Sequence, residues 1–209
     1  MAGTPYRLLG RPNAGSLAPQ MLLEEVGAAY ELIWIGREPE SLEGLRRINP
    51  AGKVPVLILP DGVAVFESAA ILIHLTDAHP DAGLAPRAGT TAHAHFLQWM
   101  TFLSSSVYEA ALRAFYPERY SRNAAREVEG IKAQALHDYA AHLELIHQAL
   151  SPYVLGEHLS AADPYLLMLQ SWYPGDAAAL TKRLPKLSQH AELLRRRPAV
   201  RKAEQDHAG

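Results

Sequence analysis

The sequence of 209 residues contains no cysteine. It therefore cannot form a disulfide, a thiolate metal site or a thiol nucleophile of its own. It also lacks any run approaching the roughly 18 apolar residues that a membrane helix needs, and its first residues show no cationic stretch followed by a long apolar run. We therefore expect no membrane association and a cytoplasmic location.

The sequence also has no large excess of either charge, because it contains 20 Lys and Arg residues and 22 Asp and Glu residues. A general binder of phosphate backbones needs a strong basic excess, so we expect no nucleic acid among the partners. The one basic cluster comprises residues 195–197 with Arg201 and Lys202. We interpret it as a solvent-exposed face at helix ends, where cations complement the helix dipole.

Ten histidines raise the question of a metal site. His93 and His95 are two residues apart, while His137, His142 and His147 are five apart. Neither spacing stacks two ligands on one helix face as an i, i+4 pair would, so we predict no metal. A Gly-rich phosphate loop and a Gly-x-Ser-x-Gly nucleophile motif are likewise missing from the sequence.

The first eighty residues alternate between strand-like and helix-like segments. The turn residues 60–62 (PDG) predict a hairpin, and Ser16 and Ser68 are placed to cap the helices that follow them. The predicted order βαβαββα is typical of a mixed α/β domain. The strands are expected at 6–9, 30–35, 54–59 and 63–66, and the helices at 17–26, 40–48 and 69–78.

A segment rich in Pro, Gly and Ala, residues 80–89, separates this half from the rest. We therefore predict two domains, residues 1–79 and 90–209, joined by this linker. The second domain is expected to be all-helical, since no strand alternation follows the linker. Its helices are predicted at 91–115, 123–150, 161–173, 176–184, 186–196 and 199–206.

Two short motifs in the first half are suited to holding a ligand. Pro55 cannot donate within a sheet, so it should begin a strand and leave the backbone of Val54 open to an extended peptide. Glu67 and Ser68 stand where a strand meets a helix, and together they could hold the ammonium and carboxylate of an amino-acid head group. The alternatives are an ordinary strand-start proline, a helix-capping Ser68 and a solvated Glu67.

Residues 49–55 (NPAGKVP), followed by Glu67 and Ser68, resemble the glutathione-binding half of the glutathione transferase family. Residues 14–19 (AGSLAP) and 24–27 (EEVG) look like the first helix of the bacterial beta class. Residues 156–163 (GEHLSAAD) are similar to the family's buried capping box, in which a Ser and an Asp bond each other's backbone N–H groups. The resemblance implies a thioredoxin-like N-terminal domain followed by an all-α domain.

The resemblance also implies glutathione as co-substrate and assigns roles to five residues. Val54 would pair its backbone with the cysteinyl part of glutathione, next to a cis bond to Pro55. Glu67 and Ser68 would hold the γ-glutamyl head. Lys53 would reach a glutathione carboxylate.

The sequence offers three candidates for the group that activates the glutathione thiol. Family members place Tyr, Ser or Thr near the end of the first strand, and the corresponding residue here is Asn13, whose amide can donate to a thiolate and lower the thiol pKa. Ser16 competes with it, with a helix cap as its alternative role. The beta class has a cysteine in the place of Gly15, so mixed-disulfide chemistry is excluded. Tyr108 could direct its hydroxyl to the sulfur or simply pack.

An electrophile pocket should be apolar, and one long predicted helix supplies aromatic and aliphatic side chains for it. We expect two of these to contact the substrate and the rest to lie in the core. The candidates are Trp99, Phe102, Tyr108, Leu112, Phe115 and Tyr116.

We expect a homodimeric glutathione transferase that conjugates the thiol to small apolar electrophiles, as in detoxification, with a dimer contact through helices 69–78 and 91–115. One alternative is glutathione-dependent peroxide or disulfide reduction, because two glutathiones can supply both sulfurs. Another is a non-catalytic glutathione-binding module, which Asn13 and Gly15 favour.

Overall fold

The computed structural model describes residues 4–208, which form two compact units. The first unit consists of two segments of the chain, the residues up to Ala85 and those from Arg195 onward. The second unit spans Pro86–Leu194. The boundary at residue 85 falls inside the predicted linker. Residues 195–208, however, group with the first unit rather than with the helical domain to which the sequence analysis assigned them.

The first unit is built on a four-stranded sheet with the order β2-β1-β3-β4. β1 is parallel to β2 and antiparallel to β3, which pairs antiparallel with β4. A parallel pair needs a crossover, which the first helix supplies, whereas β3 and β4 are joined by the predicted hairpin. The strands are β1 (Tyr6–Gly10), β2 (Tyr30–Trp34), β3 (Val56–Ile58) and β4 (Ala64–Phe66).

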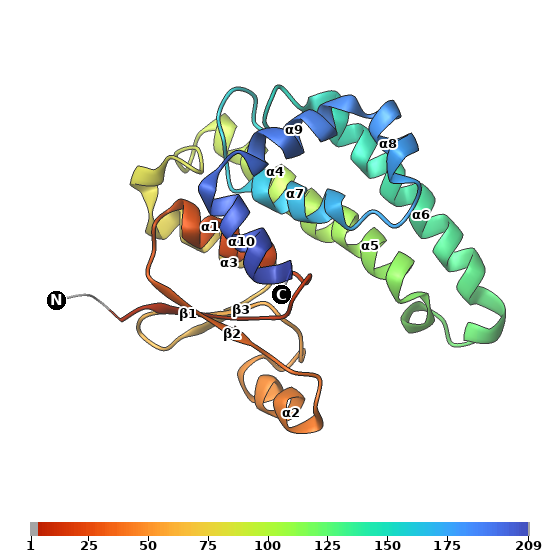
Figure 1. Cartoon of the computed structure of the whole chain (residues 1–209), viewed down its shortest axis with the longest axis horizontal. Coiled ribbons are helices and arrows are strands. Elements are labelled where there is room, and N and C mark those ends of the chain that lie inside the picture. Colours follow the sequence, from red (N-terminus) through yellow and green to blue (C-terminus); the bar gives the residue numbers. More distant parts are fainter. Residues whose placement is uncertain (1–3, 209) are drawn as a thin grey trace. The chain divides into compact units, whose positions relative to one another are not determined.

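Helices cover both faces of this sheet. Figure 1 shows α1, α3 and α10 on one face and α2 on the other. Because side chains alternate along a strand, Leu9 and Val56 pack with Leu45 of α2, while the neighbouring Leu8 and Leu57 are buried on the opposite face. The predicted mixed α/β fold is confirmed. The helices are α1 (Leu17–Glu25), α2 (Pro39–Ile48), α3 (Ser68–Ala78) and α10 (Pro198–Ala208), with a 3₁₀ turn, η1, at Pro80–Ala82.

The second unit is helical, as predicted. None of the helices within residues 4–208 is long and apolar enough to cross a membrane. The elements are α4 (Thr91–Phe102), the π-helix η2 (Leu103–Val107), α5 (Tyr108–Phe115), the 3₁₀ helix η3 (Pro117–Tyr120), α6 (Ala124–Ala149), α7 (Ala162–Ser171), α8 (Ala177–Arg183) and α9 (Pro185–Arg195).

The long helix predicted at 91–115 is interrupted by the π-helix Leu103–Val107. The serine-rich sequence of this turn explains the interruption, because the Ser105 hydroxyl donates to the carbonyl of Thr101 at 2.9 Å. Such bonds from a serine to the preceding turn compete with helical hydrogen bonds and bend helices.

Asp163 is a buried centre of hydrogen bonding in the second unit. Its carboxylate accepts from the backbone N–H groups of Val154 at 2.8 Å and Ser160 at 2.7 Å, and its Oδ1 lies 3.0 Å from Nε2 of His190. Only half of the expected capping box is present. The Ser160 hydroxyl donates to Asp163 at 3.0 Å instead of accepting from its N–H group, which bonds the Ser160 carbonyl.

Removing this carboxylate should destabilise the protein strongly. We expect Asp163→Ala to lower the free energy of unfolding by about 3–5 kcal/mol, since two N–H groups and His190 would lose a buried partner. Asp138→Ala, which removes a more exposed carboxylate, should cost no more than about 1 kcal/mol. Denaturant unfolding measures both, and equal losses would contradict the assigned role of Asp163.

His207 near the end of α10 is buried against Trp34, with ring centroids 4.9 Å apart in an edge-to-face arrangement. Neither ring nitrogen has a hydrogen-bond partner among residues 4–208. Burial lowers the pKa of His207 to about 4, although the charge of Asp206 acts in the opposite direction. The imidazole is therefore neutral in the folded protein at neutral pH.

This burial predicts an acid-sensitive part of the stability. As the pH falls from about 6.5 towards about 4, the unfolded chain takes up a proton that folded His207 does not bind, so the wild type loses stability. His207→Phe keeps an aromatic ring but not the titration. We therefore compare the free energies of unfolding of His207→Phe and wild type at pH 7 and at pH 5. The difference, variant minus wild type, should increase by about 1 kcal/mol when the pH is lowered from 7 to 5. A difference that does not change with pH would contradict this.

Candidate functional site

The loop between β1 and α1 carries Asn13, the predicted thiol-activating residue. Asn13 is exposed, has a left-handed φ of 52°, and its side chain bonds none of residues 4–208. The loop is closed by the fully buried Ser16, whose hydroxyl donates to the carbonyl of Arg11 and accepts from its N–H, both at 3.2 Å. Ser16 makes no capping bond to α1, so that prediction is wrong.

Gly10, at the end of β1, makes this closure possible. A Cβ at Gly10 would lie 2.4 Å from Oγ of Ser16 and 3.3 Å from the ring of Trp34. Both distances are shorter than ordinary contact, and Ser16 is held by its bonds to Arg11. The loop therefore closes because this position has no side chain.

Gly10→Ala should accordingly disturb the loop. We expect a loss of about 1–3 kcal/mol in the free energy of unfolding, because the added methyl overpacks a buried position. Gly44→Ala is the matched control. Gly44 lies inside α2 with open space around it, so the same change should stabilise the protein by about 0.5–1 kcal/mol. Chemical denaturation compares the two, and a neutral Gly10→Ala would contradict the close packing.

The segment before β3 presents the backbone of Val54. Asn49 shapes this segment, because its side chain donates to the carbonyl of Lys53 at 2.8 Å and accepts from the N–H of Ala51 at 3.0 Å. The bond between Val54 and Pro55 is cis, as the resemblance implies. Within residues 4–208, neither the N–H nor the C=O of Val54 has a hydrogen-bond partner. The Lys53 side chain is exposed beside them.

Glu67 and Ser68 lie where β4 meets α3. Glu67 has a φ of 74° in the N-cap position of α3, and its exposed carboxylate bonds no group among residues 4–208. Ser68 is the first residue of the helix and does not cap it. Its hydroxyl donates to the carbonyl of Gly15 at 3.3 Å, which joins the start of α3 to the β1–α1 loop. The predicted γ-glutamyl residues and the predicted thiol loop are therefore neighbours.

The predicted electrophile-pocket residues fall into separate groups within the helical unit. The rings of Trp99 and Phe102 pack edge-to-face with their centroids 5.8 Å apart, and the Phe102 ring also packs edge-to-face on His142 of α6. Tyr108 instead packs edge-to-face on Trp172 at 5.4 Å. Leu112 is half-buried on α5, and Phe115 is 48% exposed beside Tyr116.

Arg11 was not identified from the sequence. Its guanidinium donates to the carbonyls of Ile35 at 3.1 Å and Gly36 at 3.2 Å, which fastens the β1–α1 loop to the end of β2. No motif marks such a contact, because its partners are backbone atoms of a distant segment. Among the described residues, no three His, Cys, Asp or Glu side chains gather as ligands for a metal ion.

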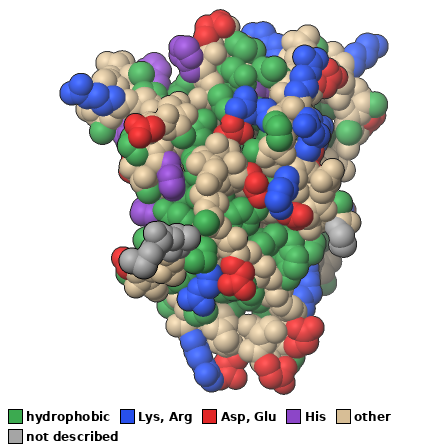
Figure 2. Space-filling view, turned by 60° about the vertical axis from the view of Figure 1, so that its left-hand side comes forward, with side chains coloured by type: hydrophobic (Ala, Val, Ile, Leu, Met, Phe, Trp, Pro, Cys, Tyr) green, Lys and Arg blue, Asp and Glu red, His purple; other side chains and the backbone are tan. Residues whose placement is uncertain are grey.

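Charges are mixed on the molecular surface. Figure 2 shows acidic and basic side chains interspersed, with hydrophobic side chains between them, on the face that it draws. This distribution agrees with the small net charge of −2.

Two family profiles match the chain. The one described as the N-terminal domain of glutathione S-transferase matches residues 16–78, and the one described as its C-terminal domain matches residues 106–206.

Among curated proteins, the chain is similar to the uncharacterized GST-like protein YncG of Escherichia coli (strain K12). The two are 30% identical over 173 residues, which is 81% of this chain and 82% of that protein. Among solved structures, it is similar to a glutathione transferase homolog from Sulfitobacter with bound glutathione (28% identity, TM-score 0.88, covering 97% and 98% of the two chains). It is also similar to a sphingomonad glutathione S-transferase complexed with glutathione (31% identity, TM-score 0.82, covering 97% and 98%).

Proposed function

Since this chain belongs to the glutathione S-transferase family, we propose that it binds glutathione on its first unit and conjugates the glutathione thiol to small apolar electrophiles. In this reaction the thiol loses its proton, and the thiolate forms a C–S bond as the leaving group departs from the electrophilic carbon. The protein's contribution is to position glutathione and to stabilise the thiolate.

The observation that carries this proposal is the conformation of Glu67. A non-glycine residue at a φ of 74° is strained, and such strain persists mainly where function requires it. The conformation leaves an unpartnered carboxylate at the N-terminus of α3, where it can bind the ammonium of the γ-glutamyl head. The carboxylate of that head is drawn to the free backbone N–H groups of Ser68 and the residues that follow it at the start of the helix.

The unpaired backbone of Val54 suits the cysteinyl part of glutathione. An extended peptide can bond both the N–H and the C=O of this residue, in the manner of an added strand. Lys53, exposed next to it, is placed to attract a carboxylate of the peptide.

For thiol activation we propose Asn13 rather than Ser16. The Ser16 hydroxyl is buried and bonded on both sides to Arg11, whereas the Asn13 amide is exposed and free of bonds within residues 4–208. A donated hydrogen bond stabilises the thiolate, and one unit of pKa shift corresponds to about 1.36 kcal/mol. The positive end of α1 follows directly and acts in the same direction.

The test is a pH titration of the thiolate absorbance of bound glutathione, together with its Kd. We expect Glu67→Ala to weaken binding roughly 10-fold to 100-fold, because it removes a charge-assisted bond. Asn13→Ala should raise the thiol pKa by about one unit and change the Kd less than about threefold. Glu40→Ala, which removes an exposed carboxylate in the first turn of α2, should behave as wild type.

A second candidate is a non-catalytic glutathione-binding module with the same fold. The engaged Ser16 hydroxyl and Gly15, in place of the beta-class cysteine, favour it, because Asn13 is then the one candidate activating group left on the β1–α1 loop. If wild-type protein binds glutathione but the thiol ionises as in water, this candidate replaces the transferase. Glutathione-dependent peroxide reduction would use the same site, and oxidised glutathione as the product would distinguish it.

We also propose a homodimer. We propose that the contact with a second copy runs through α3 and α4, on which Leu97 is an exposed apolar side chain.

A further inference from the structure

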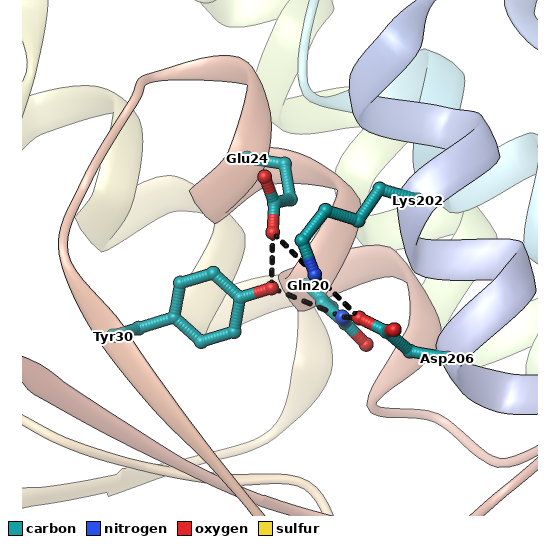
Figure 3. Close-up of polar contacts among 5 residues, drawn as sticks. All are labelled: Gln20, Glu24, Tyr30, Lys202 and Asp206. Atoms are coloured by element: carbon teal, nitrogen blue, oxygen red, sulfur yellow. Dashed lines mark hydrogen bonds and ion pairs between the residues drawn. The ribbon is translucent and has the colours of Figure 1, made fainter.

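A polar network around the buried side chain of Gln20 ties the C-terminal helix α10 to α1 and β2 (Figure 3). Gln20 of α1 is fully buried, and its Nε2 donates to Asp206 of α10 at 2.7 Å and to the Tyr30 hydroxyl at 3.0 Å. The Tyr30 hydroxyl donates to Glu24. Lys202 bonds Asp206 at 2.8 Å and lies 3.4 Å from Glu24.

The protonation states of Tyr30 and Asp206 are fixed at neutral pH. Burial and the bond to Glu24 raise the pKa of Tyr30 to about 12, so its hydroxyl stays a donor. The bond from Lys202 lowers the pKa of Asp206, so that carboxylate stays an acceptor. Because an anion accepts from Gln20, the orientation of the Gln20 amide is determined as well.

An ion pair adds to the network at the start of α10. The guanidinium of Arg197 bonds both carboxylate oxygens of Glu25 at the end of α1, with 2.9 Å between Nε and Oε2. Arg197 and Lys202 belong to the basic cluster that the sequence analysis interpreted as solvent-exposed. Lys202 is exposed, as that interpretation has it, and also pairs with a carboxylate of α1, whereas Arg197 is half-buried against Glu25.

A second set of contacts connects α10 to the β1–α1 loop. His207 packs edge-to-face on Trp34, and the Trp34 ring and Ser16 both crowd the place where Gly10 lacks a side chain. The loop held there carries Asn13 three residues after Gly10. Trp34 therefore connects His207 of α10 to Gly10, where this loop begins.

We propose that α10 positions the thiol-activating loop, with Asp206 acting through Gln20 on α1 and His207 acting through Trp34. The chemical consequence rests on the proposed function. A hydrogen bond from Asn13 to a sulfur weakens steeply with small changes in distance and angle. The γ-glutamyl end is held instead by Glu67 and α3. Loosening α10 should therefore change the thiol pKa more than the affinity for glutathione.

The first test compares three variants of α10 by thiolate titration and glutathione Kd. We expect Asp206→Ala to raise the thiol pKa of bound glutathione by about half a unit to one unit, with a Kd within about threefold of wild type. Asp206→Asn keeps an acceptor for Gln20, so the thiol pKa in this variant should be close to that of wild type. Glu204→Ala, on the same helix but bonded to Arg195, should match wild type.

The second test needs no glutathione. In the free protein, we expect Asp206→Ala to increase hydrogen exchange of the backbone amides of residues 11–17 roughly tenfold, and Asp206→Asn to reverse the increase. Lys202→Met, at a more exposed position, should act in the same direction and serves if Asp206→Ala folds poorly.

The outcomes separate the two proposals. If wild-type protein leaves the thiol as it is in water while Asp206→Ala still loosens residues 11–17, the proposed function is overturned and the positioning role stands. If the exchange of residues 11–17 is the same in Asp206→Ala and Lys202→Met as in wild type, the positioning role is overturned.

Discussion

The missing side chain at Gly10 is the constraint on which the rest of the site depends. It lets Ser16 lie directly against β1, where its hydroxyl satisfies both backbone groups of Arg11 and closes the loop. Closure leaves Asn13 exposed in a left-handed conformation and brings the Gly15 carbonyl to the hydroxyl of Ser68. One close approach between two small residues thus joins the end of the first strand to the starts of α1 and α3.

Elements with strong local signals could be predicted from the sequence. The turn residues 60–62 specify the hairpin, and apolar periodicity specifies the helices and strands within a few residues of their observed ends. The position of Val54 next to Pro55 was likewise predictable, because proline restricts where a strand can begin. These features depend on neighbours in sequence.

The errors concern groups whose role is decided by neighbours in space. Ser16 and Ser68 each stand at the start of a helix, yet their hydroxyls bond Arg11 and Gly15 instead of the helix ends. Ser160 donates to a carboxylate that three other groups also use. A hydroxyl can donate or accept in several directions, so its sequence position alone does not determine its partner. The bond between Gln20 and Asp206 spans 186 positions and has no local signal at all.

The return of α10 to the first unit has a consequence for how the protein is made. A domain that occupies one continuous stretch at the start of a chain can fold while the ribosome is still adding later residues. Here the partner of Gln20 lies 186 positions later in the chain, so the first unit lacks that contact until Asp206 has been translated. The order in which residues are translated therefore differs from the order in which this unit can be completed, because the helical unit between Pro86 and Leu194 is synthesised before α10.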